Sequence, residues 1–402
     1  MPRPTGRRRY VAPAGVVALL MLTSVVAAGA LFARWDGNAP IEASYPMPGI
    51  EELSFSSPQT REIAVQIQPF IEKNSDRAAE QSAAYRDAAR ESAAEVLPAY
   101  ADSLAPREGE VVVLTEADPQ GSQVATRMRT ELYPLLLEQI GEDAVALRTI
   151  AGDVTSNGTV AEEDFVEREA RALPDVPLVA VKGDHDSDDT VEQLRDNGVQ
   201  VPDLEVVEAG GLEVAGAADP AFKALFGGLV TNPSGVTEEE LGAALREVVD
   251  DETDAEPVTV VLHQPRAAAA YLGLGSLSEL DDLVGNETTP VDDGIPDLPP
   301  GLVTVGHLHD ASGPWVVWNT DGDEVTWTVV SQLGTSGGVE ENPTINRFST
   351  PFSAPLKDVS IRLSYVDEES GLQTGYASVV VDTDGEVTVE DRVDVGLPAD
   401  AQ

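Results

Sequence analysis

The sequence predicts an α/β domain preceded by an apolar N-terminal segment. From Glu110 onward, short β-branched runs such as 111–114 (VVVL) alternate with helical stretches such as 122–140. Several predicted strands end beside a glycine and a carboxylate or imidazole, and in α/β domains ligand groups gather at the carboxyl ends of strands. The C-terminal part instead alternates apolar and polar positions between Asp-Gly turns, which favours antiparallel sheet.

Composition narrows the possible functions. A chain of 402 residues with 42% hydrophobic residues can bury a core. Its formal net charge of −46, from 25 Lys+Arg and 71 Asp+Glu, argues against binding to a nucleic-acid backbone, which needs clustered cations. Because cysteine is absent, disulfides, a thiol nucleophile and a thiolate zinc site are excluded.

The N-terminal 1–35 is interpreted as a membrane anchor. Three arginines at 7–9 precede an uncharged apolar run over 11–33, which is long enough to span a bilayer. A cleaved signal peptide is the alternative, since 28–30 (Ala-Gly-Ala) fits a cleavage site. Both interpretations place the rest of the chain outside the cytoplasm, either as a single-pass membrane protein or as a secreted one.

The segment 36–106 is predicted to join the anchor to the domain. Residues 36–57 are rich in proline, glycine and small polar residues and are interpreted as a linker. Residues 60–104 are rich in strong helix formers and predict either a helical stalk or a helix packed on the domain. The α/β domain is then expected over 107–396.

Every histidine of the chain falls at or just past the end of a predicted strand. The four are His185, His263, His307 and His309. In an extended segment His307 and His309 point to the same face, so both can reach one metal centre. Adding Asp153 and Asp184 from neighbouring strand ends gives a mixed N/O ligand set, which suits Zn, Mn or Fe in a two-metal site.

These residues occur in motif blocks whose order resembles the calcineurin-like metallophosphoesterases. The blocks are Gly152-Asp153, Gly183-Asp184-His185-Asp186, His263 in VLHQP, and Gly306-His307-Leu308-His309. The resemblance covers roughly residues 110 to 395, and 333–340 (LGTSGGVE) is similar to a glycine-rich segment after the last block. It implies a four-layer α/β/β/α sandwich, two divalent metal ions (Mn, Fe or Zn), and hydrolysis of phosphomonoesters or phosphodiesters by a metal-activated hydroxide.

The same resemblance implies roles for individual residues. The expected metal ligands in these blocks are Asp153, Asp184, His263, His307 and His309. Asp153 would bridge the two ions, and Asp184 stands where the family usually has asparagine. His185 and Asp186 would be the catalytic residues, with His185 donating a proton to the leaving oxygen or steadying the phosphoryl group.

The first block departs from the family pattern D-x-H. The chain reads TEADPQ over 115–120. The preferred register makes Glu116 and Asp118 metal ligands, with Glu116 at the aspartate position and Asp118 at the histidine position. A second register places Asp118 at the aspartate and Gln120 at the histidine, and a solvated acidic turn is a third interpretation. Extra carboxylates would favour Mn²⁺ or Mg²⁺ over Zn²⁺ and reduce the positive charge available to a phosphoryl transition state.

Two functions therefore remain open at the level of sequence. The first is an extracytoplasmic metallophosphoesterase that acts on a phosphate-ester substrate and contacts the membrane through its N-terminal helix. The second, motivated by the altered first block, is a catalytically impaired protein of the same fold that serves as a binding or scaffold protein of the cell envelope. A different metallohydrolase of the amidohydrolase type is disfavoured by the order of the blocks.

Overall fold

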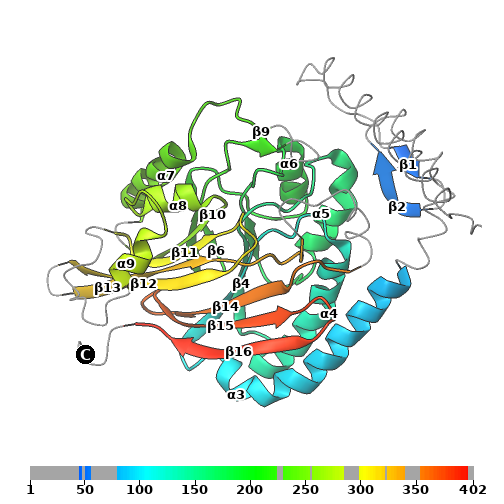
Figure 1. Ribbon diagram of the computed structural model, residues 1–402. Helices are drawn as coiled ribbons and strands as arrows, with labels where there is room; N and C mark the ends of the chain where they lie inside the picture. The colour runs from blue at the N-terminus through cyan, green and yellow to red at the C-terminus, as the bar shows by residue number, and fades with distance from the viewer. Residues whose placement is uncertain are drawn as a thin grey trace, which may run out of the picture. The chain divides into compact units, whose positions relative to one another are not determined.

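The computed structural model describes residues 45–47, 50–55, 79–223, 230–253, 256–284, 298–321, 324–339 and 354–396 (Figure 1). The described residues belong to one compact unit, Tyr45–Gln402. The anchor predicted over 1–35 lies outside the described residues, and no helix within those residues is both long and apolar enough to cross a membrane.

Two six-stranded sheets form the body of this unit, which confirms the α/β class. The first sheet has the order β16-β15-β14-β3-β4-β5, in which β3, β4 and β5 are parallel and β14, β15 and β16 are antiparallel. Its strands are β3 (Glu110–Glu116), β4 (Val145–Ile150), β5 (Leu178–Ala180), β14 (Val359–Asp367), β15 (Gln373–Val381) and β16 (Val387–Asp394).

The second sheet has the order β12-β13-β11-β10-β7-β6. Four neighbouring strands, β13, β11, β10 and β7, are parallel, and the edge strands β12 and β6 are antiparallel to them. The strands are β6 (Glu205–Ala209), β7 (Leu212–Gly216), β10 (Val258–Leu262), β11 (Gly301–Val305), β12 (Ser312–Asp321) and β13 (Glu324–Gln332). The antiparallel C-terminal part therefore divides between the two sheets.

Helices and short elements connect these strands. The α-helices are α3 (Ala101–Leu104), α4 (Gln123–Ile140), α5 (Glu163–Ala170), α6 (Asp188–Asp196), α7 (Glu238–Glu252), α8 (Pro265–Tyr271) and α9 (Glu279–Val284). Two 3₁₀ turns, η1 (Leu97–Tyr100) and η2 (Val160–Glu162), and the pair β8 (Phe222–Lys223) and β9 (Val230–Thr231) are also present. A hairpin of β1 (Tyr45–Met47) and β2 (Ile50–Phe55) lies within the stretch predicted as a linker.

The alternation of side chains along each strand builds three apolar layers. Val112 and Leu114 of β3 pack with α4, whereas Val113 between them packs in a cluster that holds residues of both sheets. On β10, Val260 packs with α7 and α8, and Val261 joins the cluster between the sheets. Helices thus cover the outer face of each sheet, as the positions of α4 and of α7 and α8 in Figure 1 illustrate.

Residues 79–96 are helical, and their apolar positions are buried against the first sheet. Tyr85, Ala89 and Ala93 belong to the same core cluster as α4, β15 and β16. Of the two alternatives raised by the sequence, a stalk or a packed helix, the structure shows the packed helix for these residues.

Glu110, at the start of β3, is expected to stabilise the fold in a way that depends on pH. Both carboxylate oxygens accept hydrogen bonds from the Arg392 guanidinium at 2.7 Å, and Thr374 Oγ1 donates to Oε1 at 2.7 Å. Burial alone would raise the pKa of Glu110, but these bonds and one from the Arg107 amide outweigh it and lower the pKa from 4.5 to about 2. The carboxylate therefore stabilises the fold above pH 4.5, and this contribution disappears as the pH falls towards 2.

We expect Glu110→Gln to unfold at lower urea concentration than the wild type at pH 6, with the gap closing between pH 4.5 and 2. Urea unfolding followed by circular dichroism over this range measures the gap. The exposed neighbour Glu108 provides the matched control, Glu108→Gln. A gap for Glu110→Gln that is constant with pH would contradict the interpretation.

Candidate metal centre

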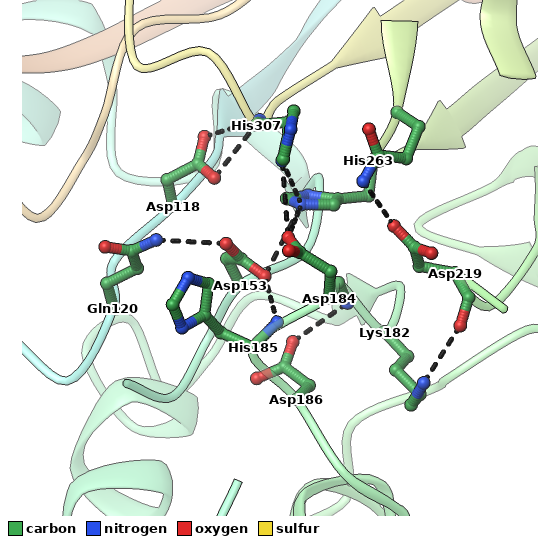
Figure 2. Close-up of polar contacts among 12 residues, drawn as sticks. Asp118, Gln120, Asp153, Lys182, Asp184, His185, Asp186, Asp219, His263 and His307 are labelled. Carbon is green, nitrogen blue, oxygen red and sulfur yellow. Dashed lines mark hydrogen bonds and ion pairs between the residues drawn. The ribbon is translucent and has the colours of Figure 1, made fainter. Parts of the chain in front are cut away.

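Parallel strands of both sheets end beside one another, and the candidate ligands follow these ends. Asp118 comes after β3, Asp153 after β4 and Asp184 after β5 of the first sheet. From the second sheet, His263 follows β10, and His307 and His309 follow β11. Figure 2 shows the labelled side chains of five of these residues turned towards a common centre. The convergence expected from the sequence is present.

The side chains form two groups that could each hold a metal ion. The four-donor group consists of Asp153, Asp184, His263 and His307, and the three-donor group of Asp118, Asp153 and His309. Within each group the ligand atoms lie within 4.8 Å of one another. Because Asp153 belongs to both, the arrangement fits two ions that share one carboxylate.

Backbone carbonyls orient two of the imidazoles. His263 Nδ1 lies 2.9 Å from the carbonyl oxygen of Ala151, and His309 Nδ1 lies 2.7 Å from that of Val339. Each Nδ1–H therefore donates to a carbonyl, and the Nε2 atom of each ring faces the carboxylates. His309 Nε2 is buried, has no hydrogen-bond partner among the described residues and lies 3.5 Å from Asp118 Oδ1. Histidines that bind metals are oriented in this way, so the donor set fits a bound cation.

The carboxylates of the two groups are buried without cationic side chains beside them. Asp118, Asp153 and Asp184 are 0%, 1% and 4% exposed. Among the described residues their ion pairs are with histidines and not with lysine or arginine. Because a buried carboxylate is costly unless it is paired or binds a metal, buried Asp and His side chains here are positioned for metal binding.

At the four-donor group, contacts between the Asp and His side chains shift the pKa of both residue types. Burial would raise the pKa of Asp184, but hydrogen bonds and charge from His263 and His307 outweigh burial and lower it. Burial would lower the pKa of His263, but the charge of Asp153 and the hydrogen bond with Asp184 outweigh burial and raise it. The carboxylates that draw a proton to this imidazole would equally draw a divalent cation.

The backbone is strained at the same residues. Asp118, Asp153, His307 and His309 have φ values of 52°, 53°, 74° and 57°, in the left-handed region that non-glycine residues seldom adopt. Such residues cost about 1–3 kcal/mol each and cluster at functional sites. The ligand side chains are thus held in place at an energetic cost.

Glycines precede the ligands because no side chain would fit. A Cβ at Gly152 would lie 2.5 Å from His263 Nδ1, and one at Gly183 would lie 2.3 Å from the backbone nitrogen of Asp153. A Cβ at Gly306 would lie 2.6 Å from the carbonyl oxygen of Ala151. These contacts explain why the Gly-Asp and Gly-His pairs seen in the sequence recur where loops of the two sheets meet.

The structure corrects the prediction that Glu116 is a metal ligand. Positions 112, 114 and 116 of β3 share one face, which packs on the helices, so the Glu116 side chain points away from the metal groups. Its carboxylate accepts hydrogen bonds from Arg129 Nη1 and Tyr133 OH, each at 2.6 Å, and from Arg148 Nε. The second register, with Asp118 as ligand and Gln120 two residues later, is the one that fits.

The partners of Glu116 form what we call the buried ion cluster. It comprises Glu116, Glu169, Arg129 and Arg148, whose side chains are at most 1% exposed. Two positive and two negative charges therefore neutralise each other between the first sheet and its helices. The cluster belongs to the fold and not to the metal groups.

The structure also corrects the catalytic role expected of Asp186. Its carboxylate is buried and accepts hydrogen bonds from Thr155 N at 2.8 Å, Thr155 Oγ1 at 2.7 Å, Gly183 N at 3.0 Å and Val154 N at 3.1 Å. Burial and the charge of Asp153 raise its pKa in spite of these bonds. Asp186 ties together the loops that carry Asp153 and Asp184, so it is a positioning residue.

His185 lies next to the shared carboxylate. Its backbone N–H donates to Asp153 Oδ1 at 2.8 Å, and its Nδ1 lies 2.9 Å from the carbonyl oxygen of Ser156. The other ring nitrogen, Nε2, is buried and has no hydrogen-bond partner in the part of the chain that the structure describes. The contact at Nδ1 therefore orients the ring, and Nε2 can form a hydrogen bond with a bound molecule.

The glycine-rich segment after β13 supports the site through the Thr335 side chain and a backbone carbonyl. Thr335 Oγ1 donates to the carbonyl oxygen of Asp118 at 2.8 Å, and Val339 supplies the carbonyl that orients His309. In the sequence, 333–340 is similar to a glycine-rich segment, but neither contact could be identified there, because both depend on backbone carbonyls, which carry no residue-type signal. Gln264, which donates to Asp219 Oδ2 at 2.7 Å, was missed although it directly follows His263.

Comparisons with known proteins give little guidance. Neither a scan of protein-family models nor a search of curated proteins finds a match to this chain. Among solved structures, the Thermus thermophilus protein TT1561 is similar to 70% of this chain and 98% of its own, with 12% sequence identity and a TM-score of 0.36. A likeness this weak leaves the function to be inferred from the site.

We expect substitution of Glu116 to affect mainly stability and substitution of Asp118 to affect mainly metal binding. Glu116→Gln leaves the arginines of the buried ion cluster with one anion fewer, so we expect the free energy of unfolding to fall by about 3–5 kcal/mol. Metal content at full loading is expected to stay unchanged. Asp118→Asn removes a donor of the three-donor group, so it should lower metal content with a smaller loss of stability.

Urea unfolding and elemental analysis of both variants check this contrast. Loss of metal in Glu116→Gln together with unaltered stability would restore Glu116 as a ligand.

Proposed function

We propose that this protein is a metal-dependent hydrolase of phosphomonoester or phosphodiester bonds. The observation that carries the proposal is the pair of donor groups joined by Asp153. Three imidazole and three carboxylate side chains supply the donors, a mixed N/O set that suits Mn, Fe or Zn. The ions that such a site binds would activate water and offset charge on the entering and leaving oxygens of a phosphate ester.

The layering of the domain agrees with this proposal. Helices, sheet, sheet and helices follow one another, as expected for the four-layer α/β/β/α sandwich of the metallophosphoesterases. The blocks of the sequence that resemble this family lie at the carboxyl ends of β4, β5, β10 and β11. The proposal places the domain outside the cytoplasm, joined to the membrane by the anchor predicted over 1–35.

His185 is the residue we assign to proton transfer. Since Nδ1–H donates to the carbonyl oxygen of Ser156, Nε2 can donate a proton only when the ring is doubly protonated. In that form the Nε2–H, which has no partner among the described residues, can protonate the leaving oxygen of a bound ester. Asp153, which accepts the His185 backbone N–H, keeps the ring beside the donor groups.

A scaffold function is the competing proposal, and Gln120 is the observation that favours it. The three-donor group contains a single imidazole, and Gln120 occupies the position of the histidine in the register that fits. A protein that purifies with only trace metal and stays inactive after addition of Mn²⁺, Zn²⁺ or Fe²⁺ would support the scaffold.

We expect His185→Ala to lower kcat by about 10²- to 10⁴-fold, because a positioned proton donor contributes this much. Its metal content should equal that of the wild type, since His185 belongs to neither donor group. The measurements are elemental analysis and hydrolysis of 4-nitrophenyl phosphate and bis(4-nitrophenyl) phosphate.

His263→Ala is the matched comparison, because it removes an imidazole that does belong to a donor group and should lose both metal and activity. Undiminished kcat in His185→Ala would reject the assigned role.

A further inference from the structure

The two donor groups differ in the ligands they offer. The four-donor group has two imidazoles and two carboxylates, whereas the three-donor group has one imidazole and two carboxylates, one of them shared. Gln120 lies beside the smaller group, is 6% exposed and has a φ of 41°. A neutral carboxamide is therefore held at the place where a further ligand would complete this group.

Side chains of the four-donor group meet at short distances. His263 Nε2 lies 3.0 Å from Asp184 Oδ1 and 3.4 Å from Asp153 Oδ1. His307 Nδ1 lies 3.2 Å from both Asp184 Oδ1 and His263 Nε2. Two nitrogens and two oxygens thus converge, which is a sufficient protein ligand set for a transition metal ion.

The three-donor group is already occupied by hydrogen bonds from the protein. Gln120 Nε2 donates to Asp153 Oδ2 at 3.0 Å, so the oxygen of the bridging carboxylate nearest this amide receives an N–H (Figure 2). The His307 backbone N–H donates to both oxygens of Asp118, at 3.1 and 3.0 Å. A cation entering this group must compete with these donors for carboxylate lone pairs.

Rotation of the Gln120 carboxamide would not make the three-donor group equal to the four-donor group as a set of ligands. Turned by half a revolution, the side chain would present Oε1, a neutral oxygen that binds Zn²⁺ or Fe²⁺ less well than an imidazole nitrogen does. Backbone contacts keep the residue in place, because its N–H donates to the carbonyl oxygen of Asp153 at 2.9 Å. Gln120 thus weakens the group in either orientation and favours harder cations.

We propose that Gln120 makes the two metal positions unequal, so that the four-donor group binds one ion tightly and the three-donor group binds a second, exchangeable ion with a preference for Mn²⁺ over Zn²⁺. The inference rests on the metal-binding part of the proposed function and is independent of the reaction. Its consequence is that the fully loaded form depends on the free concentration of the second cation.

The test is a titration of the purified, chelator-treated full-length protein with Mn²⁺ and separately with Zn²⁺, with binding followed by calorimetry and free Mn²⁺ by electron paramagnetic resonance. We expect two phases whose dissociation constants differ by about tenfold or more, equivalent to about 1.4 kcal/mol. His307→Ala should remove the tighter phase and His309→Ala the weaker one. A single transition in which two equivalents bind with equal affinity to the wild type would overturn the proposal.

Gln120→His supplies the sharpest variant, because histidine tolerates positive φ better than most residues and adds an imidazole nitrogen. We expect it to tighten the weaker Zn²⁺ phase by about tenfold or more and to leave the tighter phase unchanged. Gln200→His is the matched control, since Gln200 bonds to the Glu208 carbonyl and belongs to neither donor group. A weaker phase unaltered by Gln120→His would refute the role of Gln120.

Binding and reaction can fail separately. Unequal binding without hydrolysis of any phosphate ester would uphold this inference and reject the proposed hydrolase. Hydrolysis by a protein that binds two ions with equal affinity would support the proposed hydrolase and reject this inference.

Discussion

The site depends on one carboxylate, Asp153, which belongs to both donor groups, each of which combines ligands from the two sheets. Its backbone adopts φ of 53°, and its side chain accepts hydrogen bonds from the His185 amide and from Gln120. Gly183 lies so close that any side chain there would collide with it. A change in the Asp153 backbone would move the carboxylate that the two donor groups share. The loops after β3, β5, β10 and β11 carry the other ligands and are arranged around this residue.

The packing of the sheets is what brings these loops together. Alternate residues of β3 and β10 fill the layer between the sheets, and the parallel strands of both sheets end on the same side of it. The buried ion cluster on the other face of β3 neutralises its own charges. The buried carboxylates of the two donor groups therefore gather where cations can bind, and bound cations would offset their negative charge.

Much of this arrangement could be predicted because histidine is rare in the chain. The positions of His263, His307 and His309 after strands, with Asp153 and Asp184, indicated a shared site before any geometry was known. Glu116 was assigned wrongly because two adjacent registers of an acidic loop look equivalent in sequence. Only the partners of its side chain, Arg129 and Arg148, separate them, and these arginines lie on other elements. Likewise, the motif suggested chemistry for Asp186, whereas its bonds to backbone amides show a positioning role.

The bridging position of Asp153 can be tested by diffraction from crystals of the protein soaked in Mn²⁺, with anomalous scattering used to locate the ions. We predict two peaks about 3.5–4 Å apart. Both should contact Asp153, one with His263 and His307 and the other with Asp118 and His309. Ions that bind elsewhere, or a single ion that leaves Asp153 without a metal contact at saturating Mn²⁺, would contradict the two-ion site on which the proposed function is built.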